Sequence, residues 1–353
     1  MISSYYYTPE GTLKQNLSED EMRAIVKSKQ GLLWVDLFRP GPDELFMLDE
    51  VFAFHPLAIE DCQHISRMPK VDDYGSHLFV VFLAPNPKCH SFSVPKPGDK
   101  PVRMSASAPA PSKEIDVPHP EEEEPLHEID LFLGVNFVVT YHVAPLPFMQ
   151  LIADRAKREP KRIMGRASSF LAHDILDAAV DQFFVMVETI QVEVEELEEN
   201  ITSRGLQPML TQLLRLKGRL LGLRRQIGDH REMLSHLIRG NYEVMHPKSI
   251  IYYRDVLDHL NRIEDDLDVC RESLDSTRDA YLALTDVRTN ETLKFFTIVF
   301  TISIPITIMT GWFGMNFQNL PWIGEEWGWW VATLIMCGSS LGLYLWFRFK
   351  KLI

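Results

Sequence analysis

The chain of 353 residues has only four cysteines, and no two of them form a C-x-x-C pair. Their wide spacing indicates neither a disulfide framework nor a structural zinc site. Cys62 lies near His64 and Cys89 lies beside His90, so each pair could offer soft metal ligands. Free thiols in a reducing cytosol are the simpler interpretation. The cysteines are Cys62, Cys89, Cys270 and Cys337.

Several signals of enzymes, secreted proteins and nucleic-acid-binding proteins are also missing. The chain has no G-x-x-x-x-G-K-[ST] phosphate loop and no assignable nucleophile–base pair, so an enzyme is not indicated. Residues 1–15 are polar and lack the apolar core of a secretory signal, which predicts a cytoplasmic N-terminal part. The 36 basic and 49 acidic residues give a net charge of −13, which disfavours nucleic acid as a partner.

Charge is absent from two C-terminal segments, Phe295–Phe313 and Trp327–Phe347. Each is close to the ~20 residues that a helix needs to cross a membrane. We therefore predict transmembrane helices over about 293–313 and 327–347, in contact with membrane lipid. Buried core helices are the alternative, but six of the seven tryptophans lie near the ends of these segments, as is typical of membrane interfaces. They are Trp312, Trp322, Trp327, Trp329, Trp330 and Trp346.

Basic residues predict the orientation of these helices. The connection Gly314–Glu326 has no Lys or Arg, whereas the outer flanks carry Arg288, Lys294, Arg348, Lys350 and Lys351. Under the positive-inside rule both termini are cytoplasmic and the short connection is outside. We expect a multi-pass protein of the plasma (inner) membrane.

Residues 1–165 predict a cytosolic α/β domain, so that the whole chain is an α+β membrane protein. Strands are expected at Gly31–Leu37, Leu78–Leu83 and Ile129–His142, and helices at 18–29 and 42–52. Ten of the 22 prolines lie between Pro85 and Pro125, which predicts a flexible insertion over 85–125. The acidic run at 121–124 is either a solvated loop or a metal ligand set.

Residues 166–290 predict a helical hairpin followed by a long stalk helix. Helices are expected over 167–200 and 208–239, with a break at Ser203–Gly205. Residues 248–304 contain neither glycine nor proline, so the stalk helix is expected to continue into the first span. The remaining residues, 291–353, form the predicted transmembrane region.

An acidic residue recurs every seven positions along the stalk, and the same 3.5-residue rhythm continues into the span. In one interpretation the acids form a solvated face, while Leu257, Leu260, Ile263, Leu267 and Leu274 pack elsewhere. In the other they line a wet axial path. Two spans cannot enclose a pore, so a path requires a ring of subunits. The acids are Asp258, Asp265, Glu272, Asp279 and Asp286.

The end of the first span carries Gly314-Met315-Asn316, which resembles the signature of the CorA-type magnesium transporter family. Asn290–Lys294, Pro305 and Phe349–Lys351 are similar to other parts of that family, as are His55–Asp61 and Arg67–Val71 near the N-terminus. The resemblance covers nearly the whole chain except the Pro-rich insertion. It implies a homopentameric funnel with an axial pore for divalent cations.

The resemblance also implies roles for individual residues. Gly314, Met315 and Asn316 would form the selectivity filter, with Asn316 facing the hydrated ion. Asp255 would bind regulatory Mg²⁺ between subunits, and Asp279 would form an acidic ring at the pore entrance. Phe296 is bulkier than the aliphatic residue expected at its position. The implied pore lining is Asn290, Leu293, Phe296, Thr297, Phe300, Ile304, Thr307 and Gly311.

These features predict a passive Mg²⁺ channel that is closed by cytosolic Mg²⁺. A transporter of Co²⁺, Ni²⁺ or Zn²⁺ is the alternative within the family. Transition metals favour imidazole or thiolate ligands, and residues 293–326 contain neither His nor Cys. A membrane-anchored signalling scaffold is the alternative from a different class. The hydroxyl groups of the first span argue mildly against a simple anchor.

Overall fold

The computed structural model describes residues 1–64, 68–86, 125–200, 206–315 and 326–350. The chain divides into two compact units, Met1–Ser276 and Thr277–Ile353. Helix α8 (Ile250–Phe313) contributes its first part to the first unit and its last part to the second. Most of the Pro-rich segment lies outside the described residues.

The first unit contains a seven-stranded sheet with the strand order β2-β1-β3-β7-β6-β5-β4. Strands β3 and β7 are parallel, and all other neighbouring pairs are antiparallel. The central strands are rich in Val, Leu and Phe because helices cover both of their faces. The strands are β1 (Ile2–Tyr7), β2 (Leu13–Gln15), β3 (Leu32–Phe38), β4 (Lys70–Asp73), β5 (His77–Pro85), β6 (Leu126–Gly134) and β7 (Phe137–His142).

The segment predicted as a strand over Ile129–His142 contains a turn, so the prediction of one continuous strand is wrong. Strands β6 and β7 form an antiparallel hairpin around Val135 and Asn136. Val135 is 50% exposed, and Asn136 Nδ2 donates to the Ile25 carbonyl at 3.0 Å. Gly134 is required here because a Cβ atom would lie 2.2 Å from the Phe137 ring. The turn was missed because the surrounding residues are apolar almost without interruption.

Different helices cover the two faces of the sheet. On one face α1 (Glu19–Ser28), α2 (Pro42–Glu50) and α3 (Pro56–Gln63) bury side chains against β3, β5, β6 and β7. On the other face lies α6 (Ser168–Glu199), where the rings of Phe82 and Phe183 are 6.5 Å apart. The short helices α4 (Pro147–Arg158) and α5 (Pro160–Met164) lead into α6.

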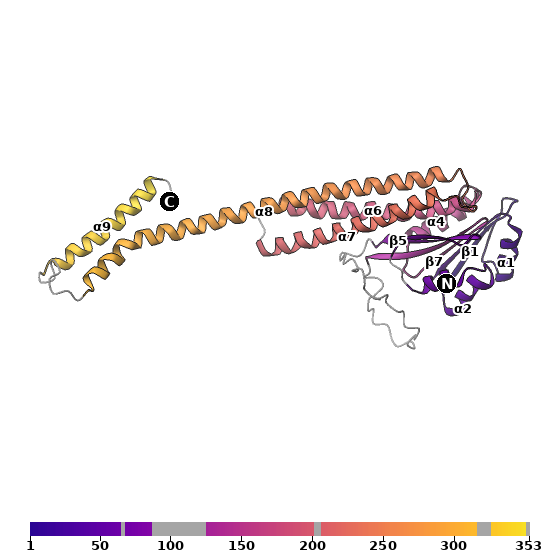
Figure 1. Ribbon diagram of the computed structural model, residues 1–353, viewed down its shortest axis with the longest axis horizontal. Coiled ribbons are helices and arrows are strands. Elements are labelled where there is room, and N and C mark those ends of the chain that lie inside the picture. The colour runs from indigo at the N-terminus through magenta and orange to yellow at the C-terminus, as the bar shows by residue number, and fades with distance from the viewer. Residues whose placement is uncertain (65–67, 87–124, 201–205, 316–325, 351–353) are drawn as a thin grey trace. The chain divides into compact units, whose positions relative to one another are not determined.

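Helices α6, α7 (Leu206–Arg239) and the first part of α8 lie side by side (Figure 1). Positions three and four residues apart along α8 are buried, which is the spacing of a helix seam packed in a bundle. This confirms that Leu260, Ile263, Leu267 and Leu274 pack inward, whereas Leu257 is only half-buried. The full seam is Tyr253, Val256, Leu260, Ile263, Leu267, Cys270, Leu274 and Thr277.

A buried histidine attaches α7 to the sheet. His230 Nε2 accepts a hydrogen bond from the Leu83 backbone N–H at 3.1 Å, and its Nδ1 lies 2.6 Å from the Gln226 carbonyl. The pairing of β4 with β5 ends at Val81, so His230 supplies an acceptor just beyond the last paired residue. Burial lowers the pKa of His230 to about 4, so the ring is neutral at physiological pH.

This attachment predicts acid sensitivity of the fold. An unfolded histidine has a pKa of about 6.5. The unfolded state therefore binds the proton first as pH falls, and stability declines between about pH 6.5 and pH 4. Below pH 4 both states are protonated and the loss levels off at about 3 kcal/mol for one such group. Burial also lowers the pKa values of His77 and His127 to about 4, so they add to the same decline.

The test is the melting temperature of the full-length protein in detergent from pH 7.5 to pH 4.5. His230→Gln should lower stability at neutral pH but make its decline with acid shallower than in the wild type. His236→Gln, an exposed position on the same helix, is the matched control and should leave the slope unchanged. Equal slopes for His230→Gln and the wild type would contradict the assignment of His230 as a source of the acid sensitivity.

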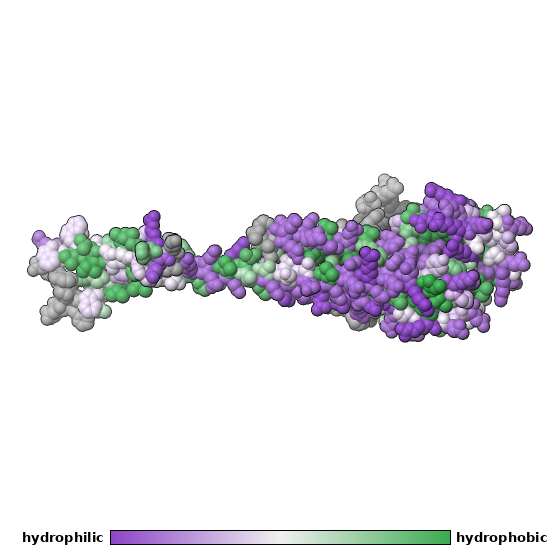
Figure 2. Space-filling view, turned by 90° about the horizontal axis from the view of Figure 1, so that it is seen from above, coloured by the Kyte–Doolittle hydropathy of each residue, from purple (hydrophilic) through white to green (hydrophobic). Residues whose placement is uncertain are grey.

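The second unit consists of the last part of α8 and helix α9 (Gly328–Phe349). Both helices are long and apolar enough to cross a membrane, which agrees with the two predicted spans. Figure 2 shows hydrophobic residues gathered on the surface of these helices. The half-buried positions of α8 follow helical spacing and form the face toward α9: Ile298, Thr301, Ile302, Pro305, Met309 and Phe313.

Candidate functional site

The predicted pore-lining residues share one exposed face of α8 in the second unit. At ~3.6 residues per turn this face lies on the side of the helix opposite the face toward α9. Phe300 is 67% exposed and Ile304 is 51% exposed, although both are large apolar residues. The exposed residues of this face are Asn290, Leu293, Phe296, Thr297, Phe300, Ile304, Thr307 and Gly311.

Hydroxyl groups interrupt this apolar face. Thr297 Oγ1 donates to the Leu293 carbonyl at 2.8 Å, and Thr307 Oγ1 donates to the Ser303 carbonyl at 3.1 Å. Each hydroxyl uses its proton within its own helix, as Ser and Thr commonly do in helices. The oxygen lone pairs remain available to accept hydrogen bonds, and the water shell of a cation presents only donors outward.

The predicted filter begins where α8 ends. The Gly314 N–H donates to the Thr310 carbonyl at 2.9 Å, and the Met315 N–H donates to the Trp312 carbonyl at 3.3 Å. A Cβ atom at Gly314 would lie 3.0 Å from the Thr310 carbonyl oxygen, so a larger residue would disturb the last turn. Asn316, the third residue of the filter, lies outside the described residues.

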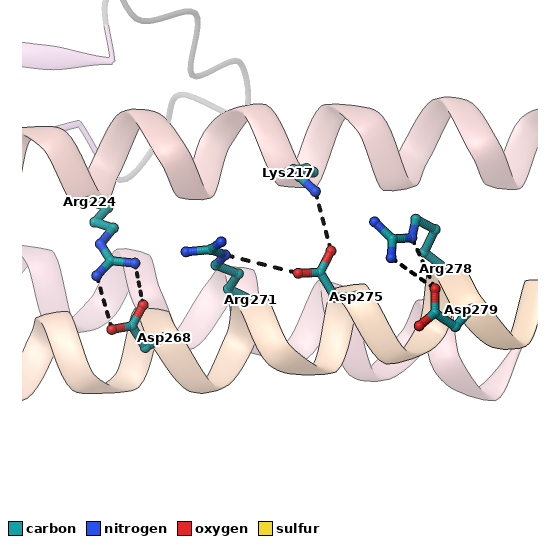
Figure 3. Close-up of polar contacts among 7 residues, drawn as sticks. All are labelled: Lys217, Arg224, Asp268, Arg271, Asp275, Arg278 and Asp279. Atoms are coloured by element: carbon teal, nitrogen blue, oxygen red, sulfur yellow. Dashed lines mark hydrogen bonds and ion pairs between the residues drawn. The ribbon is translucent and has the colours of Figure 1, made fainter.

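Two groups can be distinguished among the acidic residues of α8. One group pairs with basic residues of α7: Arg224 Nη1 lies 2.5 Å from Asp268 Oδ1, and Lys217 Nζ lies 3.2 Å from Asp275 Oδ1 (Figure 3). Arg231 pairs with Glu264 in the same way. These pairs are partly exposed ion pairs, which contribute modestly to stability.

The other group consists of the acids that recur every seven residues along α8. All five are exposed, as the solvated-face interpretation requires: Asp258, Asp265, Glu272, Asp279 and Asp286. Asp279 differs from a bare carboxylate because Arg278 Nη2 lies 2.9 Å from its Oδ1 (Figure 3). A cation that approaches Asp279 therefore competes with a guanidinium group. A wet path along this row would require further copies of the chain.

A cluster with the composition of a metal site lies between α6 and α8 in the first unit. Ligand atoms of Asp177, Asp181 and His259 all lie within 4.8 Å of one another. Asp177 Oδ1 and His259 Nδ1 are 3.5 Å apart, and both atoms are buried without a hydrogen-bond partner. A bound cation would give both atoms a partner.

The charges around Asp177 explain why a cation would be favoured. Burial raises the pKa of Asp177, the neighbouring His173 opposes this shift, and the carboxylates of Asp181 and Asp255 raise the pKa further. The sequence-predicted Asp255 is therefore close enough to act on this cluster. A divalent ion would offset both the burial and the repulsion among these acids.

Sequence reasoning named Asp255 but did not name Asp177, Asp181 or His259. The signal was present as two pairs with i, i+4 spacing, which places Asp177 with Asp181 on one face of α6 and Asp255 with His259 on one face of α8. Only the tertiary structure shows that these two faces meet. Carboxylate oxygens suit Mg²⁺, whereas the imidazole of His259 also suits Co²⁺ or Ni²⁺.

An α/β domain and a bundle of long helices are followed by two C-terminal helices that are long and apolar enough to cross a membrane, which indicates a membrane protein. The family described as CorA-like Mg²⁺ transporter protein matches residues 113–351. The chain therefore belongs to this family of divalent cation transporters.

Known relatives and solved structures agree with this assignment. The chain is 29% identical over 318 residues to YfjQ of Bacillus subtilis, covering 90% of this chain and 88% of that protein. It is 28% identical over 309 residues to the cobalt/magnesium transport protein CorA of Thermotoga maritima, covering 88% and 80%. The CorA magnesium transporter structure from Methanocaldococcus jannaschii has the same fold, with a TM-score of 0.75 at 19% identity over 99% and 97% of the two chains.

Proposed function

We propose that this chain forms a passive Mg²⁺ channel that lets the ion enter the cell and closes when cytosolic Mg²⁺ is abundant. The observation that carries the proposal is the exposed face of α8. Its residues turn away from α9 and lead directly to Gly314 and Met315. A face that mixes large apolar residues with amide and hydroxyl groups suits a narrow ion path better than lipid alone.

One chain cannot enclose such a path, so the active form is proposed to be a homopentamer. Closed symmetry turns each residue of the face into a ring of identical side chains, which is how channels select ions. Asn290 would form the inner polar ring and Asp279 the acidic ring below it. Leu293, Phe296 and Ile304 would form the apolar constriction.

The proposed ion is Mg²⁺ in its hydration shell. Mg²⁺ loses water reluctantly and prefers oxygen ligands. Carboxamide oxygens of Asn316 accept hydrogen bonds from bound water without holding the ion as tightly as carboxylates would. No ATP is needed, because a divalent cation gains about 4.6 kcal/mol per 100 mV of inside-negative potential, at ~2.3 kcal/mol per charge.

The cluster of Asp177, Asp181 and His259, with Asp255 nearby, is the proposed regulatory site. Without Mg²⁺ its carboxylates repel one another and α6 and α8 are held less firmly. Bound Mg²⁺ would neutralise them and stabilise the closed arrangement. This mechanism places the cluster in the cytoplasm, as does the positive-inside orientation with both termini inside the plasma (inner) membrane.

Co²⁺ or Ni²⁺ is the second candidate for the transported ion, because His259 offers an imidazole in the cluster. The test is uptake of Mg²⁺ into proteoliposomes that contain the purified protein and an inside-negative potential. We expect Mg²⁺ entry that Co²⁺ and Ni²⁺ reduce only when in excess, since 293–315 has neither His nor Cys. Preferred Co²⁺ or Ni²⁺ entry would reverse the ion assignment, and absence of any flux would favour a signalling scaffold.

A further inference from the structure

A side-chain hydrogen bond joins the two membrane helices. Ser340 Oγ of α9 donates to the backbone carbonyl of Ile302 in α8 at 3.0 Å, and Ser340 is half-buried. Among the described residues, no other side-chain hydrogen bond connects residues 293–313 of α8 with α9. The bond is therefore a specific attachment between helices that otherwise meet through apolar side chains.

Neighbouring hydroxyls behave differently. Thr301 Oγ1 donates to the Thr297 carbonyl at 2.7 Å, and Ser303 Oγ donates to the Val299 carbonyl at 2.9 Å. On α9, Ser339 Oγ donates to the Ile335 carbonyl at 2.7 Å. Each of these groups is satisfied within its own helix, as expected for hydroxyls in an apolar helix. Ser340 departs from this pattern, so its partner on α8 needs an explanation.

Pro305 lies three residues beyond Ile302, in the same turn of α8. Proline has no N–H to donate to Thr301, four residues earlier, and its ring crowds the carbonyl there. In membrane helices a neighbouring Ser or Thr commonly satisfies the backbone groups that proline frees. The carbonyl that loses its donor is that of Thr301, and Ser340 bonds to the next carbonyl, that of Ile302. Both residues lie with Pro305 on the half-buried face toward α9. Ser340 thus holds α8 at the turn that Pro305 weakens.

We propose that Ser340 is a positioning residue of the ion path. By holding the Ile302 carbonyl against α9, it fixes the direction in which Phe300, Ile304 and Thr307 project from the opposite face of α8. This inference rests on the proposed channel function. A closed constriction requires these side chains to keep one orientation in every subunit, so loss of the bond should make closure by Mg²⁺ less effective.

The first test compares Ser340→Ala with Ser339→Ala in proteoliposome uptake. Ser340→Ala should raise the internal Mg²⁺ concentration that halves uptake by about three-fold, the effect of losing an average interhelical hydrogen bond in a membrane. Ser339→Ala, whose hydroxyl bonds within α9, should leave this concentration unchanged. Ser340→Thr keeps a hydroxyl and should restore it. Equal values for Ser340→Ala and Ser339→Ala would overturn the proposal.

A double-mutant cycle with Pro305→Ala tests whether the bond compensates for the turn that Pro305 weakens. Alanine restores the N–H at position 305, so Ser340→Ala should have a smaller effect in that background than in the wild type. Additive effects would show that Ser340 acts independently of the proline turn. Assembly of every variant is checked by size-exclusion chromatography, which identifies any variant that fails to fold.

Hydrogen exchange separates this inference from the proposed function. Ser340→Ala should speed amide exchange over residues 302–309 in the detergent-purified protein, whereas Ser339→Ala should not. This measurement does not require transport. Unchanged exchange would overturn the positioning role even in a working channel, whereas a wild type without flux would defeat only the proposed function.

Discussion

Asn316→Ala is expected to abolish Mg²⁺ entry into proteoliposomes while the protein still assembles. The carboxamide would accept hydrogen bonds from the water shell of the ion at the outer mouth, and alanine offers no such acceptor. A ring loses all of its copies at once, so the loss should far exceed the effect of one hydrogen bond, about 0.5–1.5 kcal/mol. Uptake at the wild-type rate would contradict the assignment of the filter.

The same connection provides a matched control for this variant. Asn319→Ala removes an identical side chain three residues further along and should leave uptake close to the wild-type rate. Gly314→Ala should also reduce entry, because the added Cβ atom would lie 3.0 Å from the Thr310 carbonyl oxygen. Equal losses for Asn316→Ala and Asn319→Ala would indicate a general defect of the connection instead of a filter.

Asp177→Asn is expected to remove the response to cytosolic Mg²⁺. The amide cannot replace a charged ligand, so the Mg²⁺ concentration that protects the protein from proteolysis should rise on the order of ten-fold or more. Asp255→Ala should weaken the protection in the same direction. In the uptake assay, internal Mg²⁺ should no longer close the Asp177→Asn channel at concentrations that close the wild type.

The melting temperature tests the proposed role of Asp177 in Mg²⁺ binding independently of transport. Because burial raises the pKa of this carboxyl group, its charged form destabilises the fold when no cation is bound. Asp177→Asn should therefore keep or raise the melting temperature in EDTA but lose the increase that Mg²⁺ gives the wild type. Glu188→Gln, an exposed acid on the same helix, should behave as the wild type in both assays. A normal Mg²⁺ response in Asp177→Asn would exclude the proposed regulatory site.

Long elements with strong periodicity were predictable. Helices α6, α7 and α8 follow from extended segments with few helix breakers, and their observed ends differ by only one or two residues from the expected ones. Local ambiguity caused the errors. The turn between β6 and β7 lies in an apolar run, where neither Val135 nor Asn136 gives a strong break signal. The same limit applies to His230, whose role depends on a strand that lies 147 residues earlier in the chain.

The candidate site was predictable only where its residues are neighbours in sequence. The exposed face of α8 can be located from the sequence because one helix carries it, and the predicted filter tripeptide is a continuous motif directly after that helix. The assembly of these faces into a pentameric path remains a prediction. Asp177 and Asp181 could not be joined to Asp255 and His259, because nothing in the sequence states which faces of α6 and α8 meet.

The order of residues alone determined that the chain has two helices long and apolar enough to cross a membrane, because a charge-free helix of ~20 residues has the length and composition for this under almost any packing. In one of two interpretations, residue spacing also indicated that Leu260, Ile263, Leu267 and Leu274 of α8 pack inward, and the structure shows them buried. Only the tertiary structure decided that Asp177 and His259 approach to 3.5 Å and that Ser340 bonds to Ile302. Such contacts depend on the relative rotation of packed helices, and this rotation results from the sum of many weak side-chain contacts instead of any local pattern.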